Sequence, residues 1–192
     1  MREVLVRTRH FAILSVLVAL PAAAGSSVPV PFDVQVPLVL KALTYDRNLK
    51  SRAGDHVRIA VLVPKGARAA AERLSTALDG LPDRTVNGLP VSFREVPVSG
   101  IAALETALRD TRWVAVYVLP GFTHEELREV RRVCEVRQIL PVAAVADEVE
   151  HGMAFAIGAE AGKPQIVVNI AGSKACGSEF ELALLRVSRV VQ

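Results

Sequence analysis

Cysteine is scarce in this 192-residue sequence and its net charge is low, and each of these two features argues against a class of protein. Two cysteines, Cys134 and Cys176, are too few for a disulfide-rich scaffold, and their spacing fits no metal motif. Although 51% of the residues are hydrophobic, no apolar run reaches the roughly 20 residues that span a bilayer. The composition indicates a single globular domain with a sizeable core.

The first 24 residues have the pattern of a secretory signal peptide. Arg2, Arg7 and Arg9 form a basic segment, residues 11–20 are apolar, and an Ala-x-Ala pattern ends at Ala24. We therefore expect cleavage after Ala24 and a periplasmic location, with an uncleaved membrane anchor as the alternative. No cysteine lies beside the cleavage site, which argues against a lipoprotein.

The charge that remains after this cleavage is close to neutral. The whole chain has 23 basic and 20 acidic residues, and loss of three Arg and one Glu leaves 20 against 19, about +1. Without a concentrated basic surface, nucleic-acid binding has little support, and export argues against it as well.

The chain then alternates between apolar runs and helical patterns. Residues 25–33 are expected to be extended, and residues 34–192 to form one domain. Strands are expected over 57–63, 91–98, 113–119 and 139–145, and helices over 34–44, 67–78, 101–109 and 123–138. This alternation predicts an α/β fold with three layers and a mostly parallel sheet of the Rossmann or flavodoxin type.

The last forty residues break the alternation. Apolar runs at 153–157 and 165–170 flank a Gly-containing turn, which predicts an antiparallel hairpin at one edge of the sheet. After it, Phe180, Leu184, Val187 and Val191 recur at roughly helical spacing. We therefore expect a final helix that covers the sheet.

An oxidising compartment would permit a disulfide between Cys134 and Cys176. The sequence does not show whether their Cα atoms come within bonding reach. Two buried free thiols are the favoured alternative, because cysteine is among the most frequently buried residues.

Ligands of open α/β sheets bind beyond the carboxyl ends of the strands, which draws attention to two loops. Lys65 precedes a Gly at a helix start, where backbone N–H groups could hold an anion. Phe122 lies in a second such loop and could line a pocket. The structural alternatives, an ordinary turn at Lys65 and helix packing by Phe122, are favoured.

The sequence contains no pattern typical of catalysis, metal binding or a cofactor. Asp147, Glu148, Glu150 and His151 lie close together, but no spaced His or Cys accompanies them, and solvated loop charges explain them better. There is no nucleophile elbow, P-loop or zincin motif. We expect a non-catalytic protein without metal or cofactor.

Asn169, Ser173 and Lys174 are the strongest candidates for a binding site. They lie where the second hairpin strand ends and a polar turn begins. Asn at a strand end can fix a loop through side-chain to backbone hydrogen bonds, or it can present donors to a ligand. The structural role is favoured.

This C-terminal block also resembles a known family. A strand ending in Val-Asn-Ile, a small-residue turn with a basic residue, a Gly, then Phe, Leu-Leu and Val-Val is similar to the C-terminal signature of the YfiR family. The similarity is clearest over 152–191 and weaker over 36–43 and at Val57. The first helix is less aromatic than is usual in that family.

The resemblance implies a periplasmic, non-catalytic regulator that binds an inner-membrane signalling protein. The family includes a repressor of a diguanylate cyclase, which would place this chain in a cyclic-di-GMP pathway; a sensor kinase is an equal candidate for the partner. A homodimer is compatible with the resemblance. The alternative function is a periplasmic protein that binds a small molecule.

Overall fold

The computed structural model describes residues 30–109 and 112–191. The signal peptide expected over 1–24, and the first part of the extended segment, therefore lie outside the described residues. The strands are β1 (Val57–Pro64), β2 (Thr85–Val86), β3 (Leu89–Val98), β4 (Ala115–Val118), β5 (Leu140–Ala143), β6 (Phe155–Glu160), β7 (Lys163–Asn169) and β8 (Arg189–Val191). The helices are α1 (Phe32–Leu43), α2 (Leu49–Ala53), α3 (Arg68–Asp79), α4 (Ile101–Ala107), α5 (His124–Arg137), α6 (Ile170–Ala175), α7 (Leu182–Leu185) and a short 3-10 helix, η1 (Ala146–Val149).

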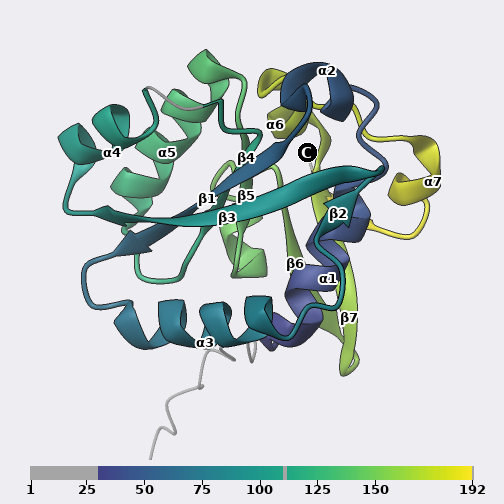
Figure 1. Cartoon of the computed structure of the whole chain (residues 1–192), viewed down its shortest axis with the longest axis horizontal. Helices are drawn as coiled ribbons and strands as arrows, with labels where there is room; N and C mark the ends of the chain where they lie inside the picture. Colours follow the sequence, from purple (N-terminus) through teal and green to yellow (C-terminus); the bar gives the residue numbers. More distant parts are fainter. Residues whose placement is uncertain (1–29, 110–111, 192) are drawn as a thin grey trace, which may run out of the picture.

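The eight strands form one sheet in the order β2-β3-β1-β4-β5-β6-β7-β8 (Figure 1). Strands β3, β1, β4, β5 and β6 are all parallel, while β2 and β7 run antiparallel to their neighbours β3 and β6. The chain moves from β1 to β3 on one side and then crosses to β4 on the other. This order, with helices on both faces, is that of a flavodoxin-like or Rossmann-like fold, as predicted.

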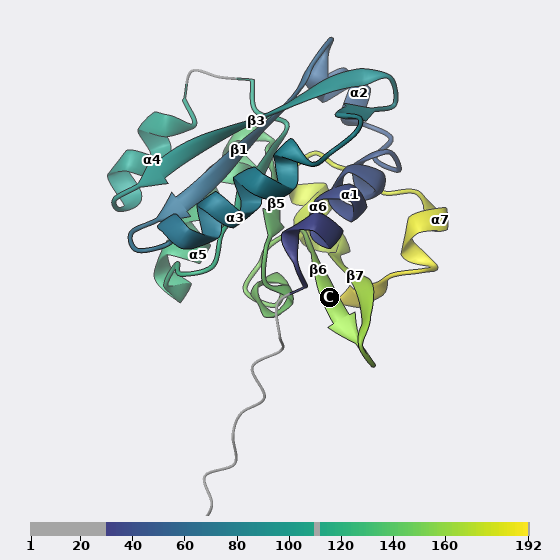
Figure 2. The ribbon, with the colours of Figure 1, turned by 60° about the horizontal axis from the view of Figure 1, so that its bottom comes forward.

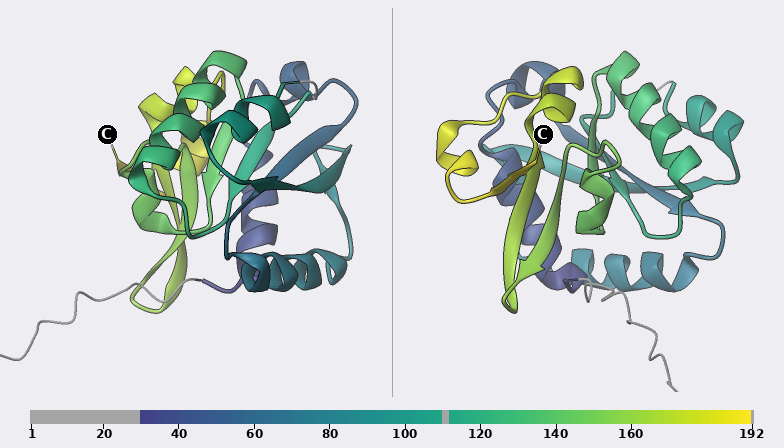
Figure 3. Two further views of the ribbon diagram at one scale, coloured as in Figure 1. Left: turned by 90° about the vertical axis from the view of Figure 1, so that its left-hand side faces the viewer. Right: turned by 180° about the vertical axis from the view of Figure 1, so that it is seen from behind.

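Two apolar cores, one on each face of the sheet, give the molecule its three layers. In β1, Ile59 and Val61 face a core shared with α1 and α3, whereas Ala60 and Leu62 face a core shared with α4 and α5. Figure 2 brings α1 and α3 forward, and the right panel of Figure 3 shows α4 and α5 on the opposite side. Burial on both faces explains why β1 is an almost continuous apolar run.

The predicted hairpin is confirmed, but the prediction of a long final helix is wrong. Strands β6 and β7 pair from Phe155 with Val168 to Glu160 with Lys163. Gly177, at φ 78°, ends the short helix α6 and redirects the chain. Phe180 then pairs with Asp46 through backbone hydrogen bonds, and Val190 and Val191 join the sheet as β8. Tertiary pairing thus overrides the helical spacing of the apolar residues.

Smaller differences lie at element boundaries. Helix α1 begins at Phe32, inside the segment expected to be extended, with Pro37 in its interior. The polar segment before β1 contains α2, and the acidic segment after β5 forms η1 instead of an open loop. Within the described ranges, no helix is long and apolar enough to cross a membrane.

Candidate functional site

Asn169 is the N-cap of α6. Its Oδ1 accepts a hydrogen bond from the backbone N–H of Gly172 at 2.7 Å, which satisfies a donor that the helix itself leaves unpaired. A Cβ at Gly172 would lie 3.1 Å from Asn169 Cγ, so this helix turn needs a small residue. The contacts of Asn169 are therefore those of a structural residue.

Ser173 and Lys174 follow on the same short helix and differ in exposure. Ser173 is buried, and its hydroxyl donates to the backbone oxygen of Asn169 at 2.7 Å and lies 3.3 Å from that of Ala154. Lys174 is exposed, and no carboxylate of the described chain lies within ion-pair distance of it.

A buried ion pair anchors the other side of this region. The carboxylate of Asp46, which is 3% exposed, binds Arg52 Nη2 and accepts hydrogen bonds from the backbone N–H groups of Asn48 and Glu179, both at 3.0 Å. Arg52 also donates to the Oγ of Ser178 at 2.8 Å. This network joins the segment after α1 to the segment after α6, although they are more than 120 residues apart.

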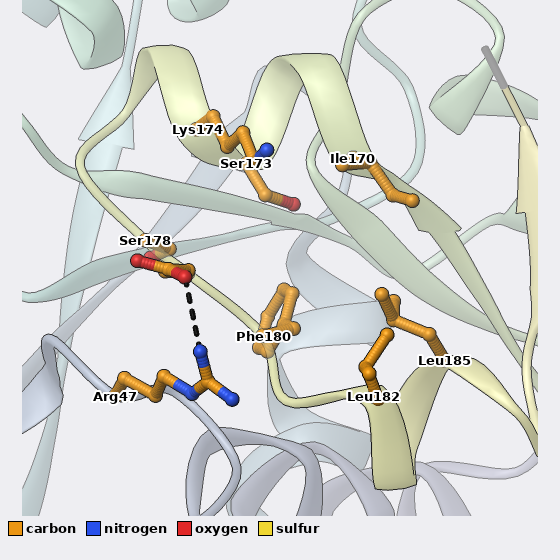
Figure 4. Close-up of a pocket in the computed structure, with 9 residues that line it drawn as sticks. Arg47, Ile170, Ser173, Lys174, Ser178, Phe180, Leu182 and Leu185 are labelled. Atoms are coloured by element: carbon orange, nitrogen blue, oxygen red, sulfur yellow. Dashed lines mark hydrogen bonds and ion pairs between the residues drawn. The ribbon is translucent and has the colours of Figure 1, made fainter.

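Between these two segments lies a cavity of about 260 Å³, which we call the Arg47 pocket. Its lining residues are Arg47, Ile170, Ser173, Lys174, Ser178, Glu179, Phe180, Leu182 and Leu185. Figure 4 shows the charged side chains at one end of the cavity and Ile170, Leu182 and Leu185 at the other, with Phe180 between them. The pocket thus has a polar end and an apolar end.

The two groups of residues predicted from the sequence lie at opposite edges of the sheet. Because β7 runs against β6, Asn169 and the Arg47 pocket lie at the amino-terminal edge of the parallel strands. Lys65 and Phe122 follow β1 and β4 at the carboxyl edge and do not line the Arg47 pocket. Lys65 is exposed, whereas Phe122 is buried in the core beneath α4 and α5.

The acidic cluster around η1 contains one perturbed carboxyl group. Burial, and secondarily the charge of Asp147, raise the pKa of Glu148 to about 7. His151 stacks on His124 with ring centroids 4.1 Å apart, a contact that the sequence did not predict. The described part of the chain holds no group of three or more His, Cys, Asp or Glu residues arranged for a metal ion.

Cys134 and Cys176 are free, buried thiols in this structure, so the disulfide alternative is not formed. Both belong to the core beneath α4 and α5. Burial raises the pKa of the Cys176 thiol to about 12 and that of Cys134 well above its ordinary value. Both thiols are therefore protonated at neutral pH and are poor nucleophiles.

Sequence reasoning missed Arg47, Ser178 and Glu179, which complete the polar end of the pocket. Arg47 and Glu179 are 132 positions apart and meet only because the backbone pairs Asp46 with Phe180. The one local signal is the polar, charged segment 46–55, whose sequence is typical of the end of a helix followed by a loop. A buried Asp in that segment is visible only in the fold.

Comparison with known proteins gives the fold but no family. No family model matches the chain, and no curated protein matches it significantly. Among solved structures, a conserved domain protein from Vibrio cholerae aligns with a TM-score of 0.60 and 15% identity over 84% of this chain and 60% of its own. An ABC domain from Streptococcus pneumonia in complex with L-Trp has a TM-score of 0.57 and 15% identity over 84% and 62%.

A third solved structure also aligns with this chain. It is a ligand-free, open substrate-binding protein with adhesive properties from Clostridium difficile, with a TM-score of 0.52 and 17% identity over 76% of this chain and 57% of its own. The chain spans about 60% of the length of these proteins. It therefore shares its α/β fold with part of each of these three proteins.

Proposed function

We propose that this chain is a periplasmic, non-catalytic protein that binds a small molecule in the Arg47 pocket. The observation that carries the proposal is the make-up of that pocket, where charged groups at one end face an apolar end within about 260 Å³. Small-molecule sites are concave and mostly apolar, with a few polar groups that fix orientation. The likeness in fold to a substrate-binding protein and to an L-Trp complex supports it.

The hydroxyl groups of the pocket have partners that suit binding better than catalysis. Ser173 donates to a backbone oxygen, and Ser178 accepts from a guanidinium group. A serine nucleophile needs an adjacent base to take its proton. Within the described ranges, neither hydroxyl has a His or a carboxylate as a hydrogen-bond partner. The periplasmic location rests on the signal-peptide pattern of residues 1–24.

A thermal-shift screen of the purified protein against a library of metabolites tests this function. A ligand at a free concentration 100 times its Kd should stabilise the fold by about 2.7 kcal/mol and raise the melting temperature by several degrees. The shift should shrink in Lys174→Gln and persist in Lys65→Gln, which alters a lysine at the other edge. A flat profile across the library would contradict the proposal.

A second candidate function is regulation of an inner-membrane signalling protein, as the resemblance to YfiR implies. It is favoured by the apolar surface of the last segment, where Leu182, Val187 and Val190 are 65%, 70% and 41% exposed. Exposed apolar side chains grouped on one segment are typical of a protein contact. Such a regulator would bias its partner by binding one of the partner's states more tightly than the other.

Affinity purification from detergent-solubilised membranes tests this second function. Recovery of a diguanylate cyclase or a histidine kinase, lost in the Leu182→Ser/Val187→Ser variant, would support it. Val136→Ser is the matched control, because Val136 is an equally exposed valine (74%) on α5. If all variants and the parent recover the same background proteins, the regulatory function fails.

A further inference from the structure

The polar end of the Arg47 pocket carries an excess of positive charge. Arg47 Nη1 lies 3.2 Å from Glu179 Oε1, and both side chains are about half exposed, so this pair is close to neutral. Lys174 adds a cation that no carboxylate of the described chain neutralises. An anion seated at this end would complete the charge balance.

Ser178 adds a fixed hydroxyl donor to the same end. The residue is 1% exposed and lines the pocket, and its Oγ accepts a hydrogen bond from Arg52 Nη2 at 2.8 Å. The bond from Arg52 occupies a lone pair and leaves the hydroxyl proton without an acceptor among the described residues. The oxygen of this hydroxyl is paired, and its proton is free to be donated to an acceptor in the cavity.

The buried ion pair holds this hydroxyl in place. Arg52 is bound to Asp46 and also donates to the backbone oxygen of Val114 at 2.8 Å. The carboxylate of Asp46 in turn fixes the backbone of Glu179, the residue that follows Ser178. The donor is therefore positioned before any ligand arrives, which lowers the entropy lost on binding.

The opposite end of the cavity suits a short apolar group. Ile170, Leu182 and Leu185 line it, and Phe180 is held edge-on against Phe155 with ring centroids 5.7 Å apart. A volume of about 260 Å³ equals that of roughly nine water molecules at about 30 Å³ each. The occupant is thus a small molecule, with a tail about the size of a phenyl ring or a short aliphatic chain.

We infer that the pocket takes a small amphipathic carboxylate, with its head between Lys174, Arg47 and Ser178 and its apolar tail against Phe180 and Leu185. A carboxylate fits because it accepts hydrogen bonds only and matches both the ammonium group of Lys174 and the hydroxyl of Ser178. This inference rests on the proposed function and names the ligand class for the same site.

Titration calorimetry with three probes of one shape tests the inference. The probes are 3-phenylpropionate, 3-phenylpropan-1-ol and 3-phenylpropylamine, which share a tail and differ only in the charge of the head. The carboxylate should bind about tenfold more tightly than the alcohol, as expected for a hydrogen bond to a charged group. The amine should bind most weakly, and the preference for the carboxylate should fall as salt is raised.

Variants of exposed residues locate the binding and leave the core intact. Lys174→Gln should weaken the binding of 3-phenylpropionate by about fivefold to tenfold and leave the affinity for the alcohol unchanged, since only the charged contact is lost. Leu182→Ser should lower the affinity for all three probes, and Lys65→Gln should change the affinity for none of them.

The results separate the ligand class from the proposed function. Equal binding of the three heads, tighter binding of the amine, or no binding by any probe would overturn the inference. Suppose that a library ligand of another chemical class binds, and that its affinity falls in Leu182→Ser. The proposed function would then stand, and the inference of a carboxylate ligand would be rejected. Absence of binding by both the probes and the library would reject both.

Discussion

Arg52 binds the buried carboxylate of Asp46 from a position six residues further along the chain, and this pair connects both segments that form the Arg47 pocket. One carboxylate oxygen binds the guanidinium, and the other accepts from the backbone N–H groups of Asn48 and Glu179. Each buried charge is neutralised by the other, and each also hydrogen-bonds to the segment after α6. Arg52 binds the hydroxyl of Ser178 and Asp46 binds the backbone N–H of Glu179, so the pair keeps both residues in fixed positions.

Removing one partner of this pair should destabilise the protein strongly. Asp46→Asn or Arg52→Gln leaves an uncompensated buried charge, and a loss of about 3–5 kcal/mol in the free energy of unfolding is expected. Urea denaturation measures it. Arg68→Gln is the control, because the exposed Arg68–Glu72 pair should contribute at most about 1 kcal/mol. A loss below 1 kcal/mol for both Asp46→Asn and Arg52→Gln would contradict the anchoring role.

Asn169 should affect stability and leave ligand affinity largely unchanged. Loss of the cap in Asn169→Ala should lower the free energy of unfolding by about 1 kcal/mol. Asn169→Asp should restore most of it, because a carboxylate oxygen also accepts from the N–H of Gly172. If the neutral cap variant Asn169→Ser retains stability yet abolishes ligand binding, Asn169 contacts the ligand directly.

Glu148 should make stability fall as pH rises from about 4.5 to about 7. Its pKa is raised from 4.5 to about 7 in the folded state, so the folded protein holds this proton more tightly than the unfolded chain does. The stabilisation from the protonated form is present below pH 4.5 and is lost between about pH 4.5 and 7. The loss should be about 1–3 kcal/mol, allowing for partial exposure.

Glu148→Gln tests the assignment, because the amide keeps the shape and cannot ionise. This variant should be more stable than the parent at pH 8 and should lack this part of the pH dependence in denaturation curves. Asp147→Asn, which removes the secondary cause, should weaken the dependence only partly. An unchanged pH profile in Glu148→Gln would assign the titration to another group.

The two thiols should be inert in the native protein. Burial keeps Cys134 and Cys176 protonated at pH 8, and reagents that need a thiolate should modify neither within the time that labels a free cysteine completely. In denaturant, two thiols per chain should react. If none reacts in denaturant without a reductant, a disulfide has formed, contrary to this structure.

Local patterns predicted the sheet well because its strands are defined by burial. The apolar run over residues 57–63 acts over a few residues and is found as β1, and the expected helix over 123–138 is found as α5, which begins at a capping box formed by Thr123 and Glu126. The prediction of a final helix was wrong because the spacing of apolar residues over 180–191 is equally compatible with backbone pairing to distant segments. Phe180 pairs with Asp46, and Val190 pairs with Val168 of β7.

The candidate site was only half visible in the sequence. Ser173 and Lys174 were noticed because polar residues follow a strand end, and both line the pocket. Arg47 and Ser178 had no such signal, since the network around Asp46 brings them to the cavity from separate parts of the chain. Lys65 and Phe122 were predicted from a general rule about carboxyl edges, and they lie at the edge away from this pocket.

The most direct test of the central claim is to map a bound ligand by amide chemical shifts in nuclear magnetic resonance. Titration with 3-phenylpropionate, or with the best ligand from the thermal-shift screen, should move the signals of residues 45–48 and 170–185 and leave those of residues 64–67 and 120–123 in place. Shifts confined to the loops at Lys65 and Phe122, or no shifts at saturating ligand, would contradict a binding site in the Arg47 pocket.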